Sequence, residues 1–222
     1  AVEDAHHGHQ RPKMDEYGQS LFVVLQIVEP AGEELRAGEV AIFVGPGYVI
    51  TVRRDSQHGF ADVRSRSELE PELLQHGPAY VLYALMDAVV DRYFPVLDGL
   101  TEEIDQVEER IFSGQSTREH IEALYGLKRK LMVLDRATGP LLEVAGKLHG
   151  GRVPPICSGL DEYFRDVYDH LLRLKQTIDS LRDMVTTGIT VNLSLIGLQE
   201  TEITKRLAAY AALAAVPTMI AG

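Results

Sequence analysis

The sequence predicts an α/β domain, in which helices flank a small β-sheet, followed by a very long stalk helix that continues into a transmembrane helix. Three observations predict this architecture. Residues 20–53 contain runs of β-branched and aromatic residues separated by turn residues. Residues 160–185 repeat apolar side chains at alternating spacings of four and three, which is the seam of a helix that packs on another helix. Residues 207–222 carry no charged side chain.

The composition excludes several classes of protein. The chain of 222 residues carries 33 acidic and 22 basic side chains, and its net charge of -11 argues against a nucleic-acid partner. The single cysteine, Cys157, excludes a disulfide framework and a thiolate zinc site, and it fits a reducing compartment. No signal peptide is recognisable at the start of the sequence. Because the first residue is Ala1 and not an initiator methionine, we expect the amino end to be truncated.

The amino end gathers carboxylates and imidazoles. Glu3 and Asp4 are followed by His6, His7 and His9, and these side chains together are able to ligate a transition metal. Their spacing matches no defined metal site, so a solvated helix end with incidental histidines is the alternative.

Three strands are expected next. Residues 20–28 form the first strand, which should end at Pro30. Residues 39–44 and 48–53 flank a Gly-Pro-Gly turn and form a hairpin. This turn is not a phosphate loop, because no helix with Lys-Ser or Lys-Thr follows it. The nearly continuous apolar runs predict strands covered on both faces, so helices should pack on the sheet.

The middle of the chain is expected to be helical. Residues 60–68 predict a short helix, and residues 78–112 a longer one that bends at Pro95, because a proline inside a helix removes a hydrogen bond. After a turn, residues 117–146 predict another helix, antiparallel to the previous one because the connection is short.

The last helix is expected to run from Ser158 to the end of the sequence, about 95 Å at 1.5 Å per residue. Its predicted seam consists of Leu160, Phe164, Val167, Leu171, Leu174, Ile178, Leu181 and Val185. Residues 207–222 are shorter than the ~20 residues that a membrane span needs, so we interpret them as a span cut off by the end of the sequence. Lys205 and Arg206 precede them, as basic residues do on the cytoplasmic side. A buried, alanine-rich helix of a soluble protein is the alternative.

These elements divide the chain into four parts. Residues 1–76 belong to a cytoplasmic α/β domain, 77–157 form a helical hairpin of that domain, 158–206 form the stalk helix, and 207–222 start the first transmembrane helix.

No arrangement of side chains indicates catalysis, so we predict neither an enzyme nor a small organic substrate. Cys157 has no evident base, and no serine lies in a nucleophile elbow. Asp87 and Asp91 are four residues apart and share a helix face. They are suited to hold a hard divalent cation or to act as an acid and base pair. Pairing with arginine or lysine of a neighbouring helix is the alternative.

Several stretches resemble the CorA family of magnesium transport proteins. They are VLYALMDAVVDRYF at residues 81–94, FRDVYDH at residues 164–170 and PTMIAG at residues 217–222, together with ED at residues 3–4 and QRPK at residues 10–13. The matches run over nearly the whole chain in the same order. The family's Gly-Met-Asn loop and second membrane helix do not occur in this sequence, so the ion cannot be identified from it.

The resemblance implies a homopentameric, funnel-shaped channel in the cell (inner) membrane, with most of this portion on the cytoplasmic side. Magnesium is implied as both the transported and the regulatory ion. By motif position, Asp166 would belong to a first regulatory site with Asp4 of a neighbouring subunit, and Asp87 to a second site with Asp91 nearby. Acids of different subunits repel one another unless a cation lies between them, so loss of the cation would splay the subunits.

The resemblance also implies a pore along the last helix. By helical position, the pore-lining set is Thr190, Thr201, Thr204, Leu207, Ala215 and Thr218. Gly188 and Asn192 interrupt the seam after Val185, so we expect the seam above Val185 to pack on protein helices and Gly188 to mark the start of the ion path.

Two alternatives remain. The first is a relative that moves Zn²⁺ or Co²⁺, for which the cluster of Asp4, His6, His7 and His9 is the only local indication. The second is a coiled-coil interaction protein with a membrane anchor, in which the heptads serve dimerisation alone.

Overall fold

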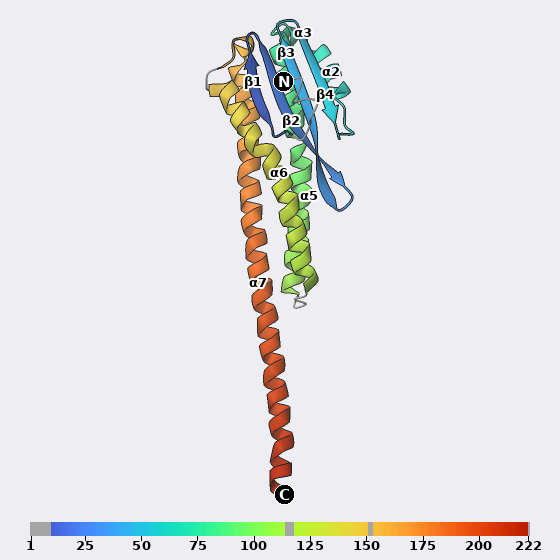
Figure 1. The fold of residues 1–222 in the computed structure, drawn as a ribbon, viewed down its shortest axis with the longest axis vertical. Coiled ribbons are helices and arrows are strands. Elements are labelled where there is room, and N and C mark those ends of the chain that lie inside the picture. The colour runs from blue at the N-terminus through green and yellow to red at the C-terminus, as the bar shows by residue number, and fades with distance from the viewer. Residues whose placement is uncertain (1–9, 114–117, 151–152, 222) are drawn as a thin grey trace.

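The computed structural model describes residues 10–113, 118–150 and 153–221, and it contains a sheet, a set of helices around it and one helix that extends far beyond both (Figure 1). The side chains of residue 214 and residues 216–221 are not described. The elements are β1 (Lys13–Tyr17), β2 (Ser20–Ala31), β3 (Glu34–Gly45), β4 (Tyr48–Arg54), α2 (Ala61–Glu68), α3 (Pro71–Leu74), α4 (Pro78–Asp91), α5 (Tyr93–Phe112), α6 (Arg118–Gly150), the short 3-10 helix η1 (Pro155–Cys157) and α7 (Asp161–Ala221). The expected fold class, a small sheet with flanking helices and a very long last helix, is confirmed.

The four strands form an antiparallel sheet in the order β1-β2-β3-β4. The hairpin at Gly-Pro-Gly is confirmed, because Gly45 pairs with Tyr48 across a two-residue loop. The expectation that the first strand ends at Pro30 is wrong, since β2 continues to Ala31 and Pro30 pairs with Leu35. β1 pairs only with the first part of β2, as far as Val24, so beyond that point β2 is an edge strand. An edge strand tolerates a proline, because the missing N–H can face away from the neighbouring strand.

The sheet is buried on both faces at its centre. Leu21, Val23, Leu25 and Ile27 of β2 join the main hydrophobic core, which the helices share. Phe22 follows Leu21 and therefore points to the opposite face of the sheet. It is also buried, and the centre of its ring lies 4.8 Å from the centre of the Phe43 ring. The prediction of strands covered on both faces is therefore confirmed for β2 and the middle of β3. The prediction does not hold for β4, where side chains such as Tyr48, Ile50 and Val52 remain exposed.

The helix expected over residues 78–112 is interrupted between α4 and α5, at Arg92, and the backbone of Arg92 itself stays in the αR region. This interruption agrees with the effect predicted for Pro95. Pro95 has no N–H to bond the carbonyl of Asp91, and its ring crowds that carbonyl, so the ladder of helical hydrogen bonds is broken just before Pro95. α6 returns antiparallel beside α5 and then continues along α7 (Figure 1).

The predicted seam of the last helix is confirmed as a buried stripe. All eight seam residues, from Leu160 to Val185, are at most 4% exposed and belong to the main core. The partner of this stripe is mainly α6 of the same chain, which runs beside the upper part of α7 (Figure 1). An intramolecular helix already covers the seam, so the heptads give no reason to expect a two-stranded coiled coil.

The expectation that Gly188 marks the start of an ion path is wrong. Gly188 faces α6, because a Cβ atom placed on it would lie 3.4 Å from Leu124 Cδ1. Asn192, one turn further on the same face, is completely buried. Gly188 therefore brings α6 and α7 close together, and the covered stripe extends past Val185 to this level.

Beyond α6, the described side chains of the long helix from Gly197 onward are all exposed within this chain. Its large apolar side chains there include Leu198, Ile203, Leu207 and Tyr210. Among the residues that the structure describes, no helix contains a stretch that is both long and apolar enough to cross a membrane. The interpretation of residues 207–222 as the start of a membrane span therefore stays a prediction, as does the division of the chain into four parts.

Candidate metal centre

Asp87, Asp166 and His170 bring three potential metal ligands together between α4 and α7. One carboxylate oxygen of each aspartate and one ring nitrogen of the histidine all lie within 4.8 Å of one another. Asp87 is partly buried in α4, whereas Asp166 is exposed and His170 partly buried on α7. This is the one such group of three or more ligands found among the described residues.

The helical repeat and aromatic packing explain why these side chains meet. Asp166 and His170 are four residues apart, so they lie on the same face of α7, with His170 Nε2 3.8 Å from Asp166 Oδ1. The rings of Tyr83 on α4 and Tyr163 on α7 are 5.1 Å apart and meet edge to face. This contact places Asp87, one turn after Tyr83, beside the α7 pair.

His170 is held so that one ring nitrogen is enclosed by protein. Its ring packs at 5.8 Å and perpendicular to the ring of Phe94. Its Nδ1 is buried and has no hydrogen-bond partner among the described residues, whereas Nε2 is the atom closest to Asp166. Nε2 is therefore the ring nitrogen that faces the Asp166 carboxylate.

Asp87 lies in an environment that disfavours its charge. Burial raises the pKa of Asp87, and the charge of Asp91 raises it further. Arg66 acts in the opposite direction, with Nη2 3.6 Å from Asp87 Oδ2, while Asp166 again raises the pKa. A divalent cation would compensate the repulsion between Asp87 and Asp166 more fully than the partly exposed arginine does.

The family resemblance implied a different grouping of these residues. It assigned Asp166 and Asp87 to two separate sites, whereas in the structure their carboxylates lie together. Asp91 is exposed and does not belong to the three-ligand group. Its charge raises the pKa of Asp87. The ion pair with Arg66 corresponds to the alternative of pairing with a neighbouring helix. Asp4, like His6, His7 and His9, lies outside the described residues.

His170 was missed as a ligand, although it stands in the FRDVYDH motif. The signal that was available is its spacing of four residues from Asp166, which places both on one helix face.

The expected pore residues lie on the exposed part of α7. Thr190, Thr201, Thr204, Leu207 and Ala215 are exposed in this chain. The three threonine hydroxyls each donate a hydrogen bond to the carbonyl four residues before, at 2.8–3.1 Å. The outer side of each hydroxyl oxygen therefore presents lone pairs, which attract cations. The side chain of Thr218 lies outside the described residues.

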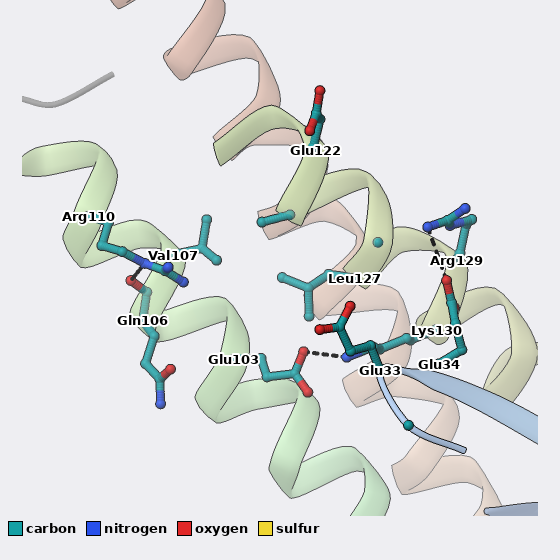
Figure 2. Close-up of a pocket in the computed structure, with 13 residues that line it drawn as sticks. Glu33, Glu34, Glu103, Gln106, Val107, Arg110, Glu122, Leu127, Arg129 and Lys130 are labelled. Carbon is teal, nitrogen blue, oxygen red and sulfur yellow. Dashed lines mark hydrogen bonds and ion pairs between the residues drawn. The ribbon is translucent and has the colours of Figure 1, made fainter. Parts of the chain in front are cut away.

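A pocket lies between the tip of the β2–β3 hairpin and the helices α5 and α6 (Figure 2). It has a volume of about 610 Å³ and is lined mostly by charged side chains. Lys130 Nζ donates to Glu103 Oε2 at 2.6 Å, and Arg129 pairs with Glu34 at 3.1 Å (Figure 2). These pairs attach α6 to α5 and to the hairpin, so we assign them a structural role.

In this fold a small α/β domain is attached to a long helix, and two carboxylates and one imidazole lie together between α4 and α7. The CorA-like Mg²⁺ transporter protein family matches residues 1–222. The chain therefore belongs to this family of transporter proteins.

Individual relatives agree with the family. The chain is 32% identical over 224 residues to the cobalt/magnesium transport protein CorA of Thermotoga maritima, covering 100% of this chain and 64% of the relative. It is 31% identical over 192 residues to the putative metal ion transporter YfjQ of Bacillus subtilis, covering 84% of this chain and 57% of the relative. The chain thus spans less than two thirds of the length of these relatives.

A solved structure shows the same fold. The complete structure of the CorA magnesium transporter from Methanocaldococcus jannaschii superposes with a TM-score of 0.82 at 21% identity. The match covers 100% of this chain and 71% of that one. The expected architecture of sheet, flanking helices and long last helix is the architecture of this structure.

Proposed function

We propose that this chain is the largely cytoplasmic portion of a divalent-cation transporter, with magnesium as the first candidate ion. We further propose that a regulatory divalent cation binds at Asp87, Asp166 and His170. The observation that supports this site is the convergence of three ligand atoms within 4.8 Å at a place where burial and neighbouring acids oppose the charge of Asp87.

The proposed regulation follows from charge repulsion. Without a cation, Asp87 and Asp166 repel one another across the contact between α4 and α7, and a bound divalent cation turns this repulsion into attraction. α7 also carries the proposed pore-lining residues, so a change at its upper end is transmitted along one continuous helix. In a homopentamer, Asp4 of a neighbouring subunit would add a further carboxylate next to Asp166.

The choice of ion depends on the ligand types. Mg²⁺ binds oxygen ligands and keeps several waters, so two carboxylates are sufficient for it. The imidazole of His170 is better suited to Co²⁺ or Zn²⁺, and this residue is the specific observation that favours a transporter of those ions as the second candidate.

Limited proteolysis tests the regulatory site. We expect millimolar Mg²⁺ to slow cleavage of the wild-type protein and to have no such effect on Asp166→Asn. Asp169→Asn is the matched control, because Asp169 is an exposed aspartate of the same helix that is paired with Arg165 and lies outside the cluster. Equal protection of wild type and Asp166→Asn by Mg²⁺ would refute the site.

Substitution of the histidine separates the two candidate ions. His170→Asn keeps both carboxylates and removes the imidazole. If the site serves Mg²⁺, the variant should bind Mg²⁺ within a few-fold of wild type; if it serves Co²⁺ or Zn²⁺, their affinity should fall by roughly tenfold to a hundredfold. Isothermal titration with each ion measures the difference.

A further inference from the structure

Arg66 places a cation of the protein itself beside the proposed divalent-cation site. Its Nη2 atom lies 3.6 Å from Asp87 Oδ2. Arg66 belongs to the last turn of α2 and Asp87 to α4, so the contact joins two helices. The distance is longer than the roughly 2.7–3.2 Å of a hydrogen bond, so the contact is an ion pair without one. Such a pair neutralises part of the charge of Asp87 and is easily separated.

The arginine does not balance the negative charge around it. The side chain of Asp87 is only 15% exposed, whereas that of Arg66 is 54% exposed, so water screens the arginine. Burial and the charge of Asp91 raise the pKa of Asp87 more than Arg66 lowers it. Asp166 adds a further negative charge on the side of α7. The cluster therefore keeps an excess of negative charge while Arg66 is in place, and a divalent cation can neutralise more of it.

Arg66 can leave Asp87 without a movement of its helix. Val63 of α2 is buried in the main core, and Asp62 at the start of α2 lies 3.3 Å from Arg92 Nη2. These contacts hold the helix independently of Arg66. Among the described residues, Asp87 is the acid with which Arg66 forms an ion pair. A change of side-chain rotamer is therefore sufficient to move the guanidinium into water.

We infer that Arg66 is an internal competitor of the divalent cation at Asp87. In the cation-free protein the guanidinium pairs with Asp87, and a divalent cation that binds there repels the guanidinium and displaces it. Binding is thus an exchange of a monovalent for a divalent cation, which lowers the affinity below that of the ligands alone. A regulatory site must lose its ion when the ion concentration falls, and the competing arginine provides this weakening. The inference rests on the proposed cation site and adds a residue that sets its affinity without being a ligand.

Isothermal titration of the full chain with Mg²⁺ tests the inference. We expect Arg66→Gln to bind Mg²⁺ roughly two- to tenfold more tightly than wild type, because the ion no longer has to displace a charge. Arg66→Lys keeps the charge and should bind within about twofold of wild type, since the contact does not depend on a bidentate hydrogen bond. Arg64→Gln is the matched control, because Arg64 lies on the same helix but pairs with Glu68, and it should bind as wild type does.

Two further measurements separate competition from a merely structural role of Arg66. In a chelating buffer Arg66→Gln should lower the Tm, because Asp87 loses its counter-ion, whereas the increase in Tm given by Mg²⁺ should be larger than in wild type. A structural arginine would lower the Tm equally with and without Mg²⁺. In wild type, the nitrogen NMR signal of the Arg66 side chain should shift as Mg²⁺ saturates the site, and it should not shift in Asp166→Asn.

The outcomes distinguish this inference from the proposed cation site. If wild type and Asp166→Asn bind Mg²⁺ equally, the site itself is wrong and the inference fails with it. If Asp166→Asn loses binding but Arg66→Gln binds no more tightly than wild type, the site stands and the competition is overturned. Should Arg66→Gln prove poorly folded by circular dichroism, the wild-type NMR titration decides, because an Arg66 signal that does not shift on saturation overturns the inference.

Discussion

At the scale of single residues, Glu29 is a buried carboxylate with a defined effect on stability. Burial raises the pKa of Glu29, but hydrogen bonds from His58, Ser56 and the Gln57 backbone outweigh burial and lower the pKa to about 2. Because this pKa lies below the ordinary pKa of 4.5, ionised Glu29 stabilises the fold, and this stabilisation is fully present above pH 4.5. The stabilisation is lost as the pH falls from 4.5 to about 2.

We therefore expect Glu29→Gln to lower the free energy of unfolding by roughly 1–3 kcal/mol at neutral pH. The difference from wild type should shrink on acidification through the same window, because protonated glutamic acid and glutamine are similar in charge and shape. Urea denaturation at several pH values measures both effects. Glu33→Gln, at the exposed turn between β2 and β3, is the control. A difference that does not change with pH would contradict this account.

The charge of Asp87 has the opposite effect on stability from the charge of Glu29. Burial raises its pKa, and Asp91 and Asp166 add to the increase against Arg66 and His170. Since its folded-state pKa lies above the ordinary value, ionised Asp87 destabilises the cation-free fold at neutral pH. We expect Asp87→Asn to raise the Tm in a chelating buffer and to remove the increase in Tm that Mg²⁺ gives to wild type.

Thermal denaturation with and without Mg²⁺ checks this pair of effects. Asp169→Asn, on the exposed side of α7, should respond to Mg²⁺ as wild type does. A lower Tm of Asp87→Asn in the chelating buffer would show that the ion pair with Arg66 matters more than burial and repulsion.

At the scale of elements, Gly188 sets the distance between α6 and α7. A Cβ atom there would make an ordinary contact with Leu124 at 3.4 Å, so alanine fits. We expect Gly188→Ala to stabilise the fold by roughly 0.5–1 kcal/mol through helix propensity. A leucine would force the helices apart and should cost about 1–3 kcal/mol.

Chemical denaturation of the two Gly188 variants measures this difference. Gly197→Ala is the matched control, because Gly197 is exposed on the same helix and meets nothing within 4 Å, so both alanine and leucine should be tolerated there. Equal tolerance of leucine at both positions would contradict close packing of α6 on Gly188.

The elements also show what could be predicted from the sequence. The seam of α7 was predictable, because burial on one helix face imposes a period that the sequence displays directly. β1 was missed because its residues, KMDEY, are largely polar and only partly buried or exposed. The interruption between α4 and α5 was predictable from Pro95, because a proline removes a backbone donor and crowds the carbonyl four residues before it.

The candidate site was predictable only in part, for a physical reason. Asp166 and Asp87 were singled out, but their meeting depends on the packing of α4 on α7 through Tyr83 and Tyr163. Sequence periodicity defines the face of one helix, and it does not define which faces meet.

At the scale of the whole molecule, α7 extends far beyond the sheet and the other helices (Figure 1). Its exposed apolar side chains beyond α6, such as Leu198, Ile203 and Leu207, are unusual for a helix that remains in water as a monomer. We expect this part of α7 to pack against other copies in a homopentamer. Native mass spectrometry of the full-length protein should give five subunits, and a monomer or dimer would contradict the proposed assembly.

The central claim is that Asp87, Asp166 and His170 form one divalent-cation site. Anomalous diffraction from crystals of the protein grown with Co²⁺ tests it most directly, because it locates the ion without reference to activity. We expect an anomalous peak within bonding distance of the Asp87 and Asp166 carboxylates and of His170 Nε2, and its loss in Asp166→Asn. An ordered Co²⁺ ion bound elsewhere, with these three side chains left without one, would contradict the claim.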